Sequence, residues 1–296
     1  MERKTAHDFD QDLLILFDAY VHGALDRRGF LEKASKYAVG GVTAAMLLEQ
    51  LSPKFAEAQV VRPDDARLAA EYIEYDSPNG SGKMRGYFAR PEKADGKRPG
   101  ILVIHENRGL NPHIEDVARR FALENFVAFA PDALFPLGGY PGDEDKAREL
   151  FPKLDQAKTR EDFVAATAFL KARPECTGKI GAVGFCYGGG MVNYLATRLG
   201  GDLAAGVPFY GSAPNTDDVA KIKCPMMIQS AEVDERINAS WPAYEQALKA
   251  ANIKYQRFLY PGTQHGFHND TTPRYDAAAA KLAWERTVAF FNQNVR

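Results

Sequence analysis

The sequence predicts an α/β protein with a mostly parallel central sheet, an antiparallel edge and helices on both faces. Strand-like and helix-like segments alternate from about Ile101 onward, which is the pattern of parallel strands connected by helices. Nearer the N-terminus, the alternating segments 71–76 and 83–89 flank the sequence Ser-Pro-Asn-Gly-Ser-Gly, which is typical of a hairpin turn. We expect this hairpin to add the antiparallel strands at the edge of the sheet.

The chain is long enough for one complete domain and an extension. It has 296 residues, of which 45% are hydrophobic, and this supplies a full core for a single α/β domain. We expect that domain to span residues 59–296 and an N-terminal extension to span residues 1–58. Helices of the domain are expected at 112–124, 143–173, 191–199, 239–251 and 276–294.

The most informative segment is 184–189, Gly-Phe-Cys-Tyr-Gly-Gly. It follows a strand-like run at 179–183 and precedes a helix-like run at 191–196, and Gly-x-nucleophile-x-Gly between a strand and a helix is a nucleophile elbow. Such a turn strains the backbone of its central residue and admits only small neighbours. Cys186 would then lie at a helix N-terminus, where free N–H groups favour a thiolate. The alternative is a Gly-rich turn with a buried structural cysteine.

A nucleophile elbow requires an acid and then a histidine further along the chain. Asp234 follows a strand-like run that starts at Cys224, and site residues collect at the carboxyl ends of parallel strands. His265 lies in a Gly-bounded loop after the alternating segment 254–260. Taken singly, the aspartate would be a turn or helix-cap residue and the histidine a surface residue. Their order after Cys186 predicts a Cys-His-Asp catalytic triad.

These motifs resemble the dienelactone hydrolase, or carboxymethylenebutenolidase, family of the α/β-hydrolase superfamily, from about Tyr72 to the C-terminus. The elbow fits the family pattern Gly-Phe-Cys-x-Gly-Gly, and an early strand ending in Glu106 resembles the segment of the family's site glutamate. The segment 127–134 is similar to a family strand that ends in Pro-Asp-Leu, and the Gly-x-x-His-Gly-Phe surroundings of His265 match as well. The resemblance implies an α/β-hydrolase fold and a hydrolase that cleaves an ester or lactone bond without a cofactor.

The chemistry follows from the residue types. His265 can take the proton of Cys186 while Asp234 fixes the imidazole tautomer, and the thiolate can form an acyl-enzyme. The tetrahedral oxyanion needs two N–H donors. We expect one from the backbone of Tyr187 and, by analogy with related folds, the other from the backbone of Asn107.

Two charged residues after the early strand bear on the nucleophile and the substrate. The resemblance implies that Glu106 takes part in a thiol/thiolate switch, whereas the alternative is a carboxylate that pairs with Arg108 or caps the next helix. Dienelactone-cleaving members hold the substrate carboxylate with two arginines, and this chain has none in either region before Arg274. Arg108 is a candidate substrate-binding residue, with a surface arginine as the alternative. We therefore expect a preference for neutral or weakly polar esters or lactones.

Other functions stay open at this point. A thioesterase or a general carboxylesterase would use the same triad, and a non-catalytic binding protein could keep the same fold. His265 and His268 lack a third nearby ligand, so we expect no metal. The net charge of -2 shows no excess of basic residues of the kind that binds nucleic acid, so we expect a small-molecule substrate and no nucleic acid. Of the three cysteines, Cys176 and Cys224 are interpreted as structural.

The first sixty residues differ in kind. Segment 26–33, Asp-Arg-Arg-Gly-Phe-Leu-Glu-Lys, resembles a twin-arginine export motif, a weakly apolar run follows at 37–48, and Ala-Glu-Ala at 56–58 offers a cleavage site. These features predict a periplasmic protein, and the run is too short for a membrane anchor. Against export, 13–17 favours a folded amphipathic helix and Glu49 interrupts the apolar run. The alternative is a cytoplasmic enzyme with retained N-terminal helices, packed on the domain or on the second subunit of a homodimer.

Overall fold

One mixed sheet organises the molecule. The computed structural model describes residues 4–93 and 95–296, so the first three residues of the expected extension lie outside it. Within the described residues, eight strands form one sheet in the order β1-β2-β4-β3-β5-β6-β7-β8. Strand β2 is antiparallel to β1 and β4, and the neighbours from β4 through β8 are parallel, which confirms the expected arrangement. The strands are β1 (Leu68–Ser77), β2 (Gly82–Pro91), β3 (Arg98–Ile104), β4 (Val127–Pro131), β5 (Cys176–Phe185), β6 (Ala205–Phe209), β7 (Met226–Val233) and β8 (Tyr255–Gln264).

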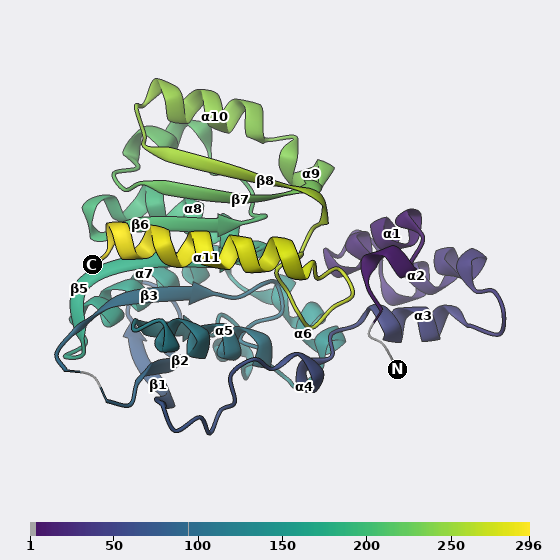
Figure 1. The fold of residues 1–296 in the computed structure, drawn as a ribbon, viewed down its shortest axis with the longest axis horizontal. Helices are drawn as coiled ribbons and strands as arrows, with labels where there is room; N and C mark the ends of the chain where they lie inside the picture. The colour runs from purple at the N-terminus through teal and green to yellow at the C-terminus, as the bar shows by residue number, and fades with distance from the viewer. Residues whose placement is uncertain (1–3, 94) are drawn as a thin grey trace.

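Helices cover both faces of this sheet (Figure 1). Apolar side chains of α5 and α11 pack on one face, and those of α6, α7, α8 and α10 pack on the other. Helices α5, α10 and α11 lie within two residues of their expected bounds. The helices of the domain are α5 (Pro112–Leu123), α6 (Glu144–Leu150), α7 (Gln156–Ala172), α8 (Tyr187–Leu199), α9 (Glu235–Asn238), α10 (Trp241–Ala250) and α11 (Ala277–Asn294). Short 3-10 helices lie at η3 (Phe135–Leu137), η4 (Phe151–Lys153), η5 (Gly200–Asp202) and η6 (Thr216–Lys221).

The single helix expected at 143–173 is wrong. Helix α6 ends at Leu150, the 3-10 turn η4 follows, and α7 starts only at Gln156. Pro152 has no N–H to donate and its ring opposes continuation of a helix. Asp155 then caps the new helix by accepting hydrogen bonds from the backbone N–H groups of Ala157 and Lys158.

The N-terminal extension is a helical unit with its own apolar core. It consists of η1 (Ala6–Asp8), α1 (Gln11–Val21), α2 (Arg27–Ala34), η2 (Ser35–Tyr37) and α3 (Ala44–Leu51). The short α4 (Phe55–Ala58) follows and contacts α5 of the domain. Phe17, Phe30 and Leu51 are buried among the helices of the unit, and the two phenyl rings meet edge to face at 6.2 Å. The amphipathic helix expected around 13–17 is therefore confirmed as part of α1. None of the described helices combines the length and apolarity that a membrane span requires.

This extension lies at one end of the sheet, beyond the tips of the parallel strands (Figure 1). The tips at that end are the carboxyl ends, where α/β proteins of this topology carry their sites. The extension thus faces the part of the domain in which the sequence places the candidate catalytic residues.

Candidate active site

The turn between β5 and α8 has the geometry of a nucleophile elbow. Cys186 has a φ of 55°, a strained value for a residue with a side chain. A Cβ added at Gly184 would lie 2.1 Å from the carbonyl oxygen of Gly188, and one added at Gly188 would lie 2.2 Å from that of Ile104. Only glycine fits at these two positions, which explains the glycines of the motif.

Helix α8 starts directly after the nucleophile, four residues before the expected start at 191. The glycines at 188–190 disfavour a helix by intrinsic propensity, but tight packing against neighbouring strands overrides that preference. Cys186 consequently occupies the N-cap position of α8, and its own N–H donates to the carbonyl of Phe209 over 3.1 Å. A negative charge on its sulfur is favoured there by the helix dipole.

Asp234 and His265 meet at the carboxyl ends of β7 and β8. The Nδ1–H of His265 donates to Oδ2 of Asp234 over 2.6 Å, which leaves Nε2 as the atom free to exchange a proton. This Nε2 is buried and has no hydrogen-bond partner among the described residues. Asp234 also accepts from the N–H of Ile237 and so caps α9, which means that the helix-cap interpretation and the pairing with His265 hold together.

Cys186 and His265 favour opposite charges on each other. Burial favours the neutral thiol, but the charges of His265 and His22 outweigh it and lower the pKa of Cys186 to about 6. Burial also opposes a charged His265, yet the Cys186 thiolate and Asp234 raise the pKa of His265 to about 10. A thiolate facing an imidazolium is therefore the favoured state at neutral pH.

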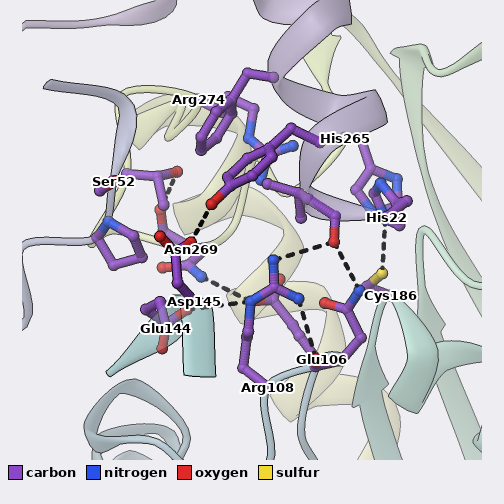
Figure 2. A pocket seen from close by; sticks show the side chains of 16 residues that line it. His22, Ser52, Glu106, Arg108, Glu144, Asp145, Cys186, His265, Asn269 and Arg274 are labelled. Carbon is purple, nitrogen blue, oxygen red and sulfur yellow. Dashed lines mark hydrogen bonds and ion pairs between the residues drawn. The ribbon is translucent and has the colours of Figure 1, made fainter. Parts of the chain in front are cut away.

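His22 is a site residue that the sequence analysis missed. It caps the C-terminal end of α1, and its Nε2 lies 3.2 Å from the Cys186 sulfur (Figure 2). Its Nδ1 lies 2.8 Å from the carbonyl oxygen of Asp18, so Nδ1 carries a proton. The available signal was the Asp18–His22 pair at helical i,i+4 spacing, next to the extension's apolar stripe.

The loop after β3 links the domain to α1. The side-chain amide of Asn107 and the guanidinium of Arg108 both donate to the carbonyl oxygen of Val21, each over 3.0 Å. Arg108 is buried rather than a surface residue, and it forms an ion pair at 3.7 Å with Glu144. Glu106 accepts from the side-chain amide of Asn269 over 2.9 Å.

These residues line one pocket between the extension and the domain (Figure 2). Arg274 also reaches this pocket, where it pairs with Asp18 at 3.1 Å. Arg274 is the first arginine after His265, beyond the position at which the family resemblance places a carboxylate-binding arginine. The lining consists of Phe17, Tyr20, Val21, His22, Ser52, Pro53, Glu106, Asn107, Arg108, Glu144, Asp145, Cys186, His265, Asn269, Thr272 and Arg274.

The potential metal ligands of the site are His22, Cys186 and His265. Their ligand atoms lie within 4.8 Å of one another, so a metal such as zinc would find three donors here. His268 contributes nothing to this group, because it stacks on Phe185 at 5.1 Å and burial lowers its pKa to about 3. The sequence suggested only the pair His265 and His268, whereas the third donor is His22, at the C-terminal end of α1.

A model described as the dienelactone hydrolase family matches residues 84–295, which is more than half of the chain. The chain belongs to the dienelactone hydrolase family. This confirms the resemblance drawn from the elbow and the segments around Glu106 and His265. A separate model, described as YqhI-like, matches residues 1–39, the part that carries His22.

Individual relatives agree with this assignment. The chain is 37% identical over 226 residues to protein usf of Aquifex pyrophilus, covering 71% of this chain and 94% of that protein. It is 30% identical over 249 residues to a provisionally named carboxymethylenebutenolidase of Escherichia coli K12, covering 79% and 90% of the two chains.

Solved structures show the same fold. A provisionally named dienelactone hydrolase from Klebsiella pneumoniae aligns with a TM-score of 0.66 at 28% identity, covering 76% of this chain and 99% of that one. The rest of this chain has no counterpart in that structure. The protein is thus a hydrolase of the α/β-hydrolase fold, and its family acts on small molecules.

Proposed function

We propose that this dienelactone-hydrolase family member cleaves an ester or lactone bond through an acyl-enzyme on Cys186. The observation that carries the proposal is the hydrogen bond of His265 to Asp234, with the remaining ring nitrogen of His265 buried beside a cysteine of lowered pKa. An inert structural cysteine has no need for a neighbouring histidine that an aspartate orients. The other two cysteines are buried, and burial raises the pKa of both.

The residues divide the chemical steps among them. The Cys186 thiolate attacks the acyl carbon, a sulfur–carbon bond forms, and the carbonyl oxygen takes the negative charge. The backbone N–H groups of Tyr187, at the start of α8, and of Asn107, in the loop after β3, are the proposed donors to this oxyanion. Collapse of the intermediate breaks the ester bond, and the leaving oxygen takes the proton of His265.

Deacylation reverses these roles. Neutral His265 takes a proton from a water molecule, which attacks the thioester, and the carbon–sulfur bond breaks to return the thiolate. Asp234 keeps the imidazole of His265 in the same tautomer throughout and stabilises it whenever it is protonated. Glu106 is proposed as an accessory residue of the nucleophile, held at the pocket by Asn269.

We also propose that residues 1–58 stay attached in the working enzyme. Two anchors support this: Tyr20 donates a hydrogen bond to Asp145, and Arg27, the first arginine of the export-like motif, forms an ion pair with the same carboxylate. Intact-mass measurement of protein from separated periplasm and cytoplasm tests it. A periplasmic protein without residues 1–58 would contradict retention and support export by the twin-arginine route.

The proposed activity is tested with a panel of enol-lactone, simple ester and thioester substrates. Purified full-length protein and its Cys186→Ala variant are compared at equal concentration. We expect turnover of at least one oxygen ester or lactone, and its loss in Cys186→Ala with the fold intact by circular dichroism. Hydrolysis by the variant at the wild-type rate would overturn the proposal, and exclusive turnover of thioesters would reassign the substrate class.

A further inference from the structure

The Cys186 sulfur lies between two Asp–His pairs. One is Asp234–His265 of the domain, and the other is Asp18–His22 of the extension. The two imidazoles meet edge to face with ring centroids 4.8 Å apart. Nδ1 of His265 donates to the carboxylate of Asp234, whereas Nδ1 of His22 donates to the backbone carbonyl of Asp18 and lies 3.3 Å from its carboxylate. In both rings this leaves Nε2 on the side of the thiol.

Specific contacts fix His22 in this position. The carbonyl oxygen of Val21, the preceding residue, accepts hydrogen bonds from Asn107 and Arg108 of the domain. The Asp18 carboxylate lies 3.3 Å from Nδ1 of His22 and also pairs with Arg274. These contacts hold the end of α1 against the pocket and thereby keep His22 next to Cys186.

We infer that His22 is a catalytic residue of this enzyme, an imidazolium supplied by the extension that holds Cys186 as a thiolate and so leaves the proton of His265 for the leaving group. This inference rests on the proposed function, because it assigns a second partner to the same nucleophile. The two histidines then have different tasks: His22 stabilises the thiolate and His265 transfers the proton. A thiolate with one cationic partner must share it between stabilisation and proton transfer, whereas two partners separate the tasks.

The charges around His22 support its protonated form. Burial alone would lower the pKa of His22, but the Cys186 charge and the hydrogen bond with Asp18 raise it above its usual value. Among the cations, His265 opposes the charge on His22, and Arg274 pairs with Asp18. Arg236 places its Nη2 3.2 Å from Nε2, and because a guanidinium only donates hydrogen bonds, this contact favours a neutral His22. Since Arg236 is half-exposed, its guanidinium can turn to solvent when Nε2 carries a proton, and that proton is then donated to the Cys186 sulfur 3.2 Å away.

The protons balance over one cycle. His22 keeps both of its protons from start to end, while His265 gives one to the leaving oxygen and regains one from water. Cys186 is a thiolate before the attack and again after deacylation, so His22 stabilises it as nucleophile and as leaving group. No oxidant, metal or additional reactant is required.

The test is the pH dependence of Cys186 alkylation by iodoacetamide, which reports the thiolate fraction without requiring turnover. His22→Gln keeps a hydrogen-bonding side chain but cannot carry the charge. His7→Gln is the matched control, because His7 is exposed in the same extension and lies outside the pocket. Peptide mapping confirms that the label is on Cys186 rather than on buried Cys176 or Cys224.

We expect His22→Gln to raise the apparent pKa of alkylation by about one pH unit. The acid limb of kcat/KM should move in the same direction, and His7→Gln should behave as wild type. Asp18→Asn removes a carboxylate that favours the protonated form of His22 but keeps the imidazole, so it should raise the apparent pKa of alkylation by less. A packing defect alone would lower activity at all pH values without moving the midpoint.

Three outcomes would overturn the inference. The first is that folded His22→Gln has the same alkylation midpoint as wild type. If His22→Gln does not fold, the same result for Asp18→Asn counts instead. Another is stoichiometric zinc in the purified wild type, because the thiolate would then be a metal ligand. The third, hydrolysis retained by Cys186→Ala, would remove the proposed function as well, whereas the first two leave it standing.

Discussion

His22 and Cys186 lie 3.2 Å apart although 164 positions separate them in the chain. The nucleophile comes from the family domain, and its second histidine neighbour comes from a segment outside the family match. The pocket is consequently shared between two units, and the extension forms part of its wall. Changes in residues 1–58 should therefore affect chemistry as well as stability.

Removal of His265 should cost nearly as much activity as removal of Cys186, because residues of a triad act as a unit. Asp234→Asn should lower kcat by about 10³–10⁴-fold, since the ring loses its fixed tautomer. Steady-state kinetics on the best ester substrate measure both variants.

Glu232→Gln is the matched control for the acid. Glu232 lies near the end of the same strand, β7, but its carboxylate accepts from the N–H of Gly262 and does not contact His265. It should retain activity close to that of wild type. A damaging Glu232→Gln beside a harmless Asp234→Asn would identify Glu232 as the catalytic acid instead.

Activity should rise with pH through about 6 on a substrate that does not titrate. The lowered pKa of Cys186 leaves it a neutral thiol below that value and a thiolate above it. A second limb should fall only in the alkaline range, because the raised pKa of His265 keeps its proton available for the leaving group. The profile of kcat/KM against pH measures both limbs, and a rising limb near the ordinary thiol pKa would contradict the ion pair.

A neutral ester should be preferred to a carboxylated one of the same size. Both guanidinium groups of the pocket already have carboxylate partners, Arg108 with Glu144 and Arg274 with Asp18. A substrate carboxylate would have to compete with these ion pairs for charge-assisted hydrogen bonds. The ratio of kcat/KM for a carboxylated lactone and its methyl ester decides this, and a clear preference for the acid would point to Arg108 or Arg274 as its clamp.

The domain and the positions of Cys186, Asp234 and His265 could be predicted because their signals are local. The elbow is a run of glycines around one nucleophile, and topology brings the ends of consecutive parallel strands together. The break between α6 and α7 was missed, although Pro152 and Asp155 are ordinary stop and start signals.

His22 and Arg274 could not be placed in the same way. Their positions depend on tertiary contacts, namely Val21 with Asn107 and Arg108, and Arg274 with Asp18. No periodicity in the sequence reports that α1 lies over the pocket. The twin-arginine interpretation of 26–33 stays a prediction, since a helix N-terminus capped by Asp26 carries the same residues.

The acyl-enzyme is the central claim, and mass spectrometry of acid-quenched reactions tests it most directly. Full-length protein is mixed with an activated acetyl ester, quenched early in turnover, and digested for peptide mapping. We expect one added acetyl group, located on Cys186, formed during an initial burst and absent in Cys186→Ala. Acetylation at another residue in both proteins, with equal turnover by the variant, would contradict it.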